Sequence, residues 1–156
     1  MLILNVLQME MTPVKLNADE HTQTGTGNKI FKQAFLFGKR SIVRASHRKF
    51  SKGATIFPVH IGDFVVIEED CVVMAAQVGS YTFIGRGAVV GRSSIIKECC
   101  RVEPGCVIAP DSVFPPFSII AGNPGRVVAQ LPDCAQELSM ETARQIYDAH
   151  IITKCT

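Results

Sequence analysis

Histidines and cysteines are the residues of this sequence best suited to catalysis or metal binding. The four histidines are His21, His47, His60 and His150. A histidine that acts as a general base needs an orienting partner within hydrogen-bond reach, and none of the four has one in a recognisable motif. The six cysteines include no Cys-x-x-Cys pair, a spacing typical of structural zinc sites. The sequence therefore predicts no catalytic residue, no metal site and no cofactor.

Length and composition limit the class of protein. The chain has 156 residues, of which 47% are hydrophobic and 19% charged, as expected for one globular domain rather than a disordered chain. The net charge of +2 is too small to require a nucleic-acid partner. No apolar run approaches the roughly 18 residues of a membrane span. The apolar start, residues 1–7, lacks the basic flank and cleavage site of a signal peptide, so we expect reduced cysteines and a cytosolic location.

The strongest pattern is an internal repeat of six residues. Its members are Ile61, Ile67, Val73, Val78, Ile84, Val90, Ile96, Val102, Ile108, Phe114 and Ile120, with one step of five from Val73 to Val78. A six-residue unit can hold a short strand and a tight turn, and three units close a triangular coil of about 18 residues. The repeat therefore predicts a parallel β-helix with these residues pointing inward.

Two further positions of the repeat have their own residue preferences. A compact residue lies four places after each inward residue, where the wall bends; Cys71, Cys100 and Cys106 are there as apolar fillers, whereas Cys99 is expected to face outward. Glycine often follows the inward residue, and we expect it to tolerate the turn dihedral angles. The glycines of Gly85-Arg86-Gly87 are turn residues on this interpretation, because a phosphate-binding loop would have to join a strand to a helix.

The repeat also gives the domain boundaries. We expect a flexible segment over residues 1–27, the β-helix over residues 28–130, and a C-terminal helix and tail over residues 131–156. In the helix, Leu138, Ala143 and Ile146 recur at helical spacing and should lie against a face of the prism.

The first coil of this β-helix shows the repeat less clearly. Ile30, Leu36 and Ile42 are six residues apart and are predicted to point inward, although Arg40 then occupies a position meant for a small residue. Residues 48–60 break the register and are predicted to form an inserted loop.

Charge is unevenly distributed around this loop. Residues 28–53 hold eight Lys or Arg and no Asp or Glu, and residues 54–70 hold four acidic and no basic residues. Such blocks often mark partner surfaces, and solenoid insertions often lie on the binding face. The predicted partner-binding residues are Arg48, Lys49, Phe50, Lys52, Phe57, Glu68, Glu69 and Asp70. The alternative is an ordinary solvated face, with Phe50 and Phe57 fixing the loop to the prism wall.

The hexapeptide repeat resembles two enzyme families with left-handed parallel β-helices, and the left-handedness comes from this resemblance. Residues 65–79 resemble the zinc-binding stretch of γ-class carbonic anhydrases, but Glu69 and Met74 stand where that family has two ligand histidines. A thioether and a lone carboxylate do not rebuild a three-histidine zinc site. Residues 113–125 resemble the closing turn of many coenzyme A-dependent acyltransferases. Both activities stay open as alternatives.

A more specific resemblance is carried by four stretches of sequence. These are Lys49-Phe50-Ser51-Lys52-Gly53, residues 57–63, residues 67–73 and residues 75–81. Together they strongly resemble the dynactin subunit 5 family. The resemblance implies a non-catalytic subunit of dynactin's pointed-end complex in the cytoplasm and cytoskeleton. It further implies pairing with a second β-helical subunit, and engagement of cargo adaptors for dynein-driven transport on microtubules.

The sequence departs from this family at one place. Between Gly38 and Ser41 the family pattern has roughly two further coils, and here Lys39 and Arg40 bridge the gap. Because each coil of a solenoid contacts only its neighbours, the shortened stack is still expected to fold. Partner contacts made by the missing coils are not expected in this chain.

Overall fold

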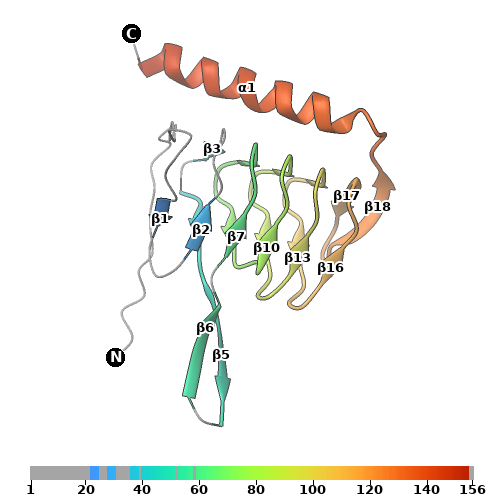
Figure 1. Ribbon diagram of the computed structural model, residues 1–156. Coiled ribbons are helices and arrows are strands. Elements are labelled where there is room, and N and C mark those ends of the chain that lie inside the picture. Colours follow the sequence, from blue (N-terminus) through green and yellow to red (C-terminus); the bar gives the residue numbers. More distant parts are fainter. Residues whose placement is uncertain are drawn as a thin grey trace.

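The computed structural model describes residues 22–24, 28–30, 36–38, 40–51, 53–57 and 59–154, and shows a left-handed parallel β-helix followed by a long helix (Figure 1). Three sheets form the walls of the prism. The first contains β1 (Thr22–Thr24), β2 (Asn28–Ile30), β7 (His60–Ile61), β10 (Gln77–Val78), β13 (Ile95–Ile96) and β16 (Val113–Phe114). The second contains β3 (Leu36–Phe37), β8 (Val66–Ile67), β11 (Phe83–Ile84), β14 (Arg101–Val102), β17 (Ser118–Ala121) and β18 (Arg126–Gln130). The third contains β4 (Ile42–Val43), β9 (Val72–Val73), β12 (Val89–Val90) and β15 (Val107–Ile108).

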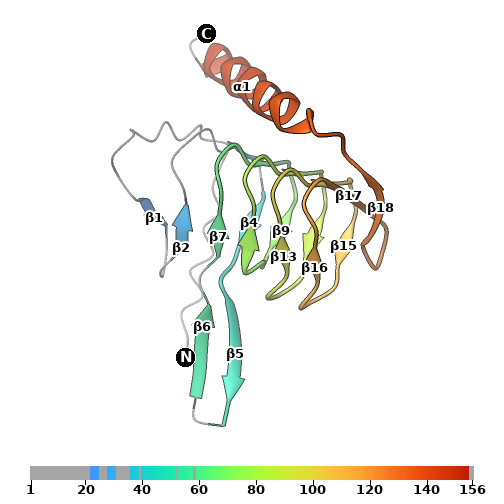
Figure 2. The same cartoon turned by 45° about the vertical axis from the view of Figure 1, so that its right-hand side comes forward.

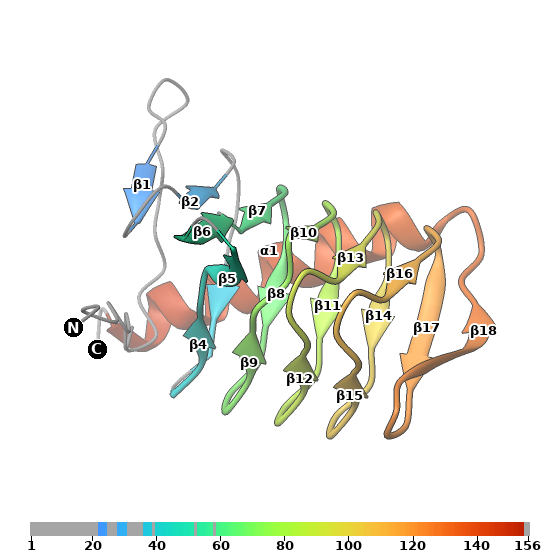
Figure 3. The ribbon, with the colours of Figure 1, turned by 90° about the horizontal axis from the view of Figure 1, so that it is seen from below.

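The stacked coils place the repeat residues in a single core. Apart from the terminal strands β1 and β18, successive strands of each wall pair in parallel (Figure 3). Ile61 therefore lies beside Val78, and Val78 beside Ile96. All eleven inward residues from Ile61 to Ile120 are buried, none with more than 6% of its surface exposed. Cys71, Cys100 and Cys106 are buried at the small positions. The predicted repeat and its inward face are confirmed.

The glycines of the repeat have a different role from the one predicted. Gly62, Gly79, Gly85 and Gly91 do not have positive φ; the left-handed corner conformation is adopted instead by residues such as Phe64, Tyr81 and Cys99. A Cβ atom added to Gly79 would lie 2.5 Å from the backbone of Lys97 and Glu98 in the next coil. Glycine is therefore required because neighbouring coils approach closely, not because the turn needs its dihedral freedom.

The register of the first coil differs from the prediction by one residue. Ile30 pairs with Ile61 as expected, but Phe37 pairs with Ile67 and Val43 with Val73, so these two strands align one residue later than predicted. Ser41, which is 3% exposed, takes the small position that the sequence pattern had assigned to Arg40. The reason is a step of seven residues between Ile30 and Phe37, which strict counting by six cannot follow.

The last helix covers one side of the prism. α1 (Ala135–Lys154) runs along the stack of coils (Figures 1 and 2). Its Ala143 is fully buried in a cluster with Phe64 and Val66, and Met140 and Ile146 pack against the same cluster. The prediction that the helix lies against the prism is confirmed, although Leu138 is 62% exposed and does not contribute. Among the described residues, no helix is both long and apolar enough to cross a membrane.

The C-terminal end of the prism is closed by a turn. Gly125 donates a backbone hydrogen bond to the Val107 carbonyl at 2.7 Å, and Val107 donates to Gly122 at 3.0 Å, so this turn pairs with the last strand of the third wall. The chain then forms β18, which runs antiparallel to β17 and is exposed along its whole length. The parallel repeat therefore ends at residues 121–125.

Cys99 and the N-terminal segment were also the subject of predictions from the sequence. Cys99 lies at a corner of the prism, but it is only 2% exposed, so the expectation that it faces solvent is wrong. The predicted flexible segment over residues 1–27 lies outside the described residues, apart from β1, which pairs antiparallel with β2.

Candidate partner interface

The insertion predicted at residues 48–60 is an antiparallel β-hairpin. It consists of β5 (Ser46–Phe50) and β6 (Gly53–Phe57), with Ser46 opposite Phe57 and Phe50 opposite Gly53. The hairpin leaves the prism after β4, returns at β7, and extends away from the coils on the side opposite α1 (Figures 1 and 2). The paired segment begins at Ser46, two residues before the start of the predicted insertion.

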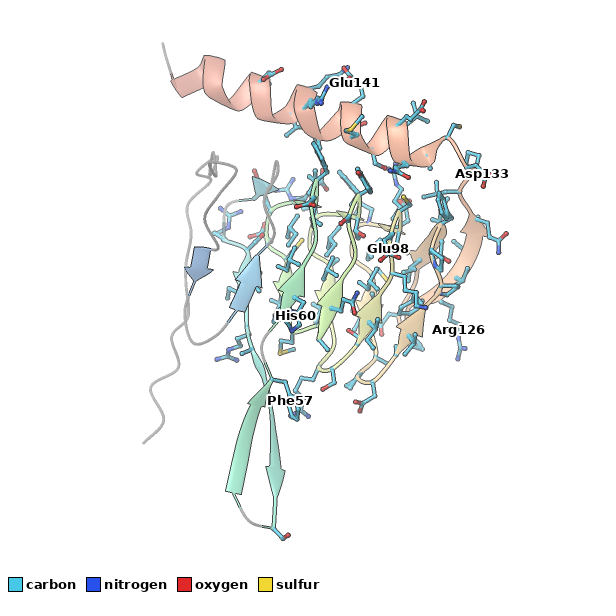
Figure 4. The ribbon with its side chains drawn as sticks, viewed as in Figure 1. Phe57, His60, Glu98, Arg126, Asp133 and Glu141 are labelled. Atoms are coloured by element: carbon cyan, nitrogen blue, oxygen red, sulfur yellow. The ribbon has the colours of Figure 1, made fainter. Side chains whose placement is uncertain are left out.

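Four of the predicted partner residues belong to this hairpin strand pair. Arg48, Lys49 and Phe50 lie in β5, and Phe57 ends β6. Phe57 is 38% exposed, so part of its surface is open to solvent (Figure 4). Lys52, the fifth predicted residue of this segment, lies outside the described residues.

The other predicted residues, Glu68, Glu69 and Asp70, form the corner between β8 and β9. Asp70 adopts a left-handed φ of 59°, and Arg40 adopts the same φ at the equivalent corner of the preceding coil. The Arg40 Nε atom lies 2.6 Å from Asp70 Oδ1. Arg86, from the following coil, lies 3.5 Å from Glu69 and 4.0 Å from Asp70. We call Arg40, Glu69, Asp70 and Arg86 the corner cluster.

The electrostatics of the corner cluster follow from these contacts. The hydrogen bond from Arg40 lowers the pKa of Asp70, and the same bond with Asp70 raises the pKa of Arg40. Glu68 Oε2 accepts a hydrogen bond from the backbone N–H of Arg86 at 2.8 Å. The three acidic residues are thus already engaged by groups of the neighbouring coils.

The structure does not bring the predicted hairpin residues and the predicted acidic residues together at one edge of the prism. The hairpin lies where the third wall meets the first, because it joins β4 to β7. The acidic residues lie where the second wall meets the third, between β8 and β9. The hairpin and the corner cluster are therefore two separate candidate surfaces, and the role of each in binding stays a prediction.

Sequence reasoning did not find the two arginines of the corner cluster. Arg40 and Asp70 are 30 positions apart in the sequence. They become neighbours only when the coils are stacked, because they occupy the same corner of consecutive coils. A signal was nevertheless present, because the corner residue always directly precedes the small residue, as in Asp70-Cys71 and Arg40-Ser41. Aligning the coils on that position places Arg40, Asp70 and Gly87 in one column.

The described residues offer little for catalysis. His60 is the one histidine whose side chain is described, and it is exposed on β7 (Figure 4). Burial raises the pKa of the Cys71, Cys99, Cys100 and Cys106 thiols, which keeps them protonated and poorly nucleophilic. Within the described parts of the chain, no group of three or more His, Cys, Asp or Glu side chains is placed to hold a metal ion.

Comparison with known proteins decides the family. The family model for Dynactin subunit 5 matches residues 36–154, which is most of the chain. This chain belongs to the dynactin subunit 5 family. The chain is also 47% identical over 116 residues to the Dynactin subunit 5 of Dictyostelium discoideum, a match that covers 74% of this chain and 59% of that protein. The chain thus spans less than two thirds of its dynactin subunit 5 relative.

One solved structure agrees with the fold of this dynactin subunit 5 family member. A hexapeptide transferase family protein from Anaplasma phagocytophilum matches with a TM-score of 0.54 at 18% identity, over 59% of this chain and 55% of that one. A maltose O-acetyltransferase from Clostridium difficile 630 matches more weakly, with a TM-score of 0.40 at 19% identity, over 49% of this chain and 50% of that one. At these identities the likeness concerns the β-helix alone.

Proposed function

We propose that this chain is a non-catalytic structural subunit of the dynactin pointed-end complex. In this role it supports the engagement of cargo adaptors for dynein-driven transport along microtubules, in the cytoplasm and on the cytoskeleton. The observation that carries the proposal is the 47% identity to the Dictyostelium discoideum Dynactin subunit 5. Its partners on this proposal are other pointed-end subunits, including a second β-helical subunit, and dynein cargo adaptors.

The chemistry of the described side chains supports a role without catalysis. The four described core and corner thiols have raised pKa values because burial disfavours the thiolate. Ser41, Thr82, Ser94 and Ser118 are buried polar residues, and each hydroxyl is hydrogen-bonded to a backbone carbonyl. These groups stabilise corners between coils, which is a structural use of residues that enzymes employ as nucleophiles.

The hairpin is the surface that we propose for partner binding. Residues 46–57 contain three Lys or Arg and no Asp or Glu, so the complementary surface on the partner is acidic. Phe57 adds exposed aromatic area of the kind enriched in interfaces. Glu68, Glu69 and Asp70 are proposed as a second contact region, weaker in electrostatic terms because Arg40 and Arg86 already neutralise part of their charge.

Affinity purification tests the proposed function. The full chain, tagged at its C-terminus, is expressed in cells at endogenous level, and the recovered proteins are identified by mass spectrometry. Recovery of dynactin pointed-end subunits is the expected result, with Ile84→Asp as the control that cannot fold. Recovery of none of them by the folded wild-type chain would contradict the proposal.

A direct measurement separates this function from acyl transfer. A coenzyme A-dependent acyltransferase must bind coenzyme A, so isothermal titration of the purified chain with acetyl-coenzyme A gives heat of binding if that alternative holds. On the proposed function, no binding is expected at millimolar ligand.

A further inference from the structure

Serines that follow basic residues occur at several places in the sequence. Basophilic protein kinases recognise Lys or Arg two and three positions before the acceptor hydroxyl, by charge complementarity with their substrate cleft. Ser51, preceded by Arg48-Lys49-Phe50, is the one Ser or Thr in the sequence with basic residues at both positions. Ser41 follows Lys39 and Arg40, and Ser94 follows Arg92 by two residues, so these two carry partial versions of the same signal.

The three serines differ in their exposure to solvent. Ser41 is 3% exposed, and its hydroxyl donates to the Glu68 carbonyl and accepts from the Cys71 N–H. Ser94 is fully buried, and its hydroxyl donates to the Gly91 carbonyl at 2.7 Å. Neither hydroxyl can reach a kinase active site while the prism is folded. Ser51 is exposed.

The position of Ser51 in the hairpin also favours access. The pair Phe50 and Gly53 closes the hairpin, so Ser51 lies in the turn at its outer end. This end projects away from the coils (Figure 1). Among the described strands, β5 and β6 pair only with each other. An isolated two-stranded ribbon is marginally stable. Its end can therefore open locally without unfolding the prism, and a kinase can bind residues 48–51 in extended form.

We propose that Ser51 is a phosphorylation site for a basophilic serine/threonine protein kinase. In the transfer, the γ-phosphoryl group of MgATP passes to Ser51 Oγ. The new Oγ–P bond forms as the bond from the γ-phosphorus to the bridging oxygen breaks. ADP leaves, and the hydroxyl proton passes to the catalytic carboxylate of the kinase.

Phosphorylation would change the charge of the hairpin. A phosphoserine carries about −1.5 to −2 charges at pH 7, against the three basic residues between positions 46 and 57. About half to two thirds of the positive charge is neutralised at the outer end of the ribbon. This consequence rests on the proposed role of the hairpin as a binding surface, and it predicts weaker binding of an acidic partner after phosphorylation.

In vitro phosphorylation of the full chain tests the site. The folded protein is incubated with MgATP and the catalytic subunit of cAMP-dependent protein kinase or, separately, protein kinase C, and phosphate is mapped by mass spectrometry. We expect one phosphate per chain on Ser51, lost in Ser51→Ala. Arg48→Gln with Lys49→Gln should slow the transfer about tenfold, as expected for a lost charge-assisted contact. The matched control Lys97→Gln with Arg144→Gln removes two charges elsewhere and should leave the rate unchanged.

The outcomes are distinguishable from those that test the proposed function. Phosphate on Ser41 or Ser94 in the folded chain, incorporation unchanged by Ser51→Ala, or no incorporation with either kinase would overturn the inference, and each leaves dynactin membership untouched. Phosphate on Ser51 with reduced recovery of pointed-end subunits supports both the site and its consequence. Phosphate on Ser51 with unchanged recovery supports the site and contradicts the hairpin as the binding surface.

Discussion

The Arg40 guanidinium forms two hydrogen bonds with the Asp70 carboxylate, from Nε to Oδ1 at 2.6 Å and from Nη2 to Oδ2 at 3.0 Å. The two residues occupy the same corner of consecutive coils. Gly38 and Ser41 on either side of this corner are hydrogen-bonded to the next coil in regular register. The corner at Arg40, where the sequence resemblance predicted further coils, therefore has the hydrogen bonds of an ordinary corner of the β-helix.

Replacing Asp70 tests how this contact depends on pH. The folded pKa of Asp70 is below its unfolded value, so the contribution to stability is present above the unfolded pKa of about 3.9 and is lost as pH falls through the folded pKa. Asp70→Asn should lower the melting temperature slightly at pH 7, because exposed ion pairs contribute little, and should match wild type at the lowest pH. Melting curves between acid and neutral pH measure this. The control Asp148→Asn removes the same charge on α1, and an Asp70→Asn effect independent of pH would contradict the contact.

Ile84 tests the register of the repeat. It is fully buried among the inward residues, so Ile84→Ala should lower the free energy of unfolding by about 2–4 kcal/mol through lost burial and a cavity. Ile84→Asp should prevent folding, because it buries an unpaired charge. Denaturant unfolding followed by circular dichroism measures both, with Val113→Ala, at a residue 62% exposed, as the near-neutral control. A folded Ile84→Asp variant of wild-type stability would show that the register is wrong.

The docking of α1 is tested by two residues of the same helix. Ala143 is fully buried against the prism, whereas Leu138 is 62% exposed. Ala143→Glu should destabilise the chain by about 1–3 kcal/mol from overpacking alone, whereas Leu138→Glu should change stability by no more than about 0.5 kcal/mol. Equal effects of the two substitutions in a thermal melt would mean that the helix does not use this face.

The six-residue period of the sequence predicts some features of the fold and cannot predict others. From Ile61 onward each step is six residues, apart from the single step of five, so the inward face could be read directly from the apolar pattern. In the first coil, a step of seven moved the aligned positions to Phe37 and Val43, and no apolar count distinguishes Leu36 from Phe37. The close approach that requires glycine at Gly79 depends on the stacking distance between coils, which is not visible within one repeat.

The two candidate surfaces could also be predicted only in part from the sequence. The hairpin could be located because residues 48–60 break the period, but its antiparallel pairing depends on contacts between its own two strands. The corner cluster joins three coils through Arg40, Glu69, Asp70 and Arg86. The charge pattern along the sequence led to the prediction that the acidic residues and the hairpin form one surface. They lie at different corners of the prism, and the charge pattern does not show which corner a residue occupies.

The exposed strand β18 predicts self-association of the isolated chain. Val127 and Val128 are 42% and 61% exposed on this edge strand, and unpaired edges with apolar residues favour association. Light scattering of the purified wild-type chain should show species larger than a monomer, reduced by Val127→Lys with Val128→Lys, because edge lysines oppose strand pairing. Leu138→Lys, an equally exposed site on α1, should have no effect. A monodisperse wild-type monomer at high concentration would contradict the prediction.

Charge reversal tests the hairpin as a binding surface. Lys49→Glu with Lys52→Glu leaves Phe57 in place, so the melting temperature should barely change. Recovery of pointed-end subunits or an adaptor should fall, and the deficit should be larger at low salt, where electrostatic attraction is less screened. The matched control Lys97→Glu with Arg144→Glu reverses two charges away from the hairpin and should retain the partners. Full retention by the folded hairpin variant would exclude these lysines from the interface.

Density-gradient sedimentation of a cell lysate tests membership in dynactin most directly. The chain alone has a mass of 17.0 kDa and should remain near the top of the gradient if it is free. If it is a structural subunit, the tagged chain at endogenous level should sediment in the fractions that contain the other dynactin subunits, and should shift with them when the complex is depleted. A folded chain found only in the light fractions, with dynactin intact in the heavy ones, would contradict the account.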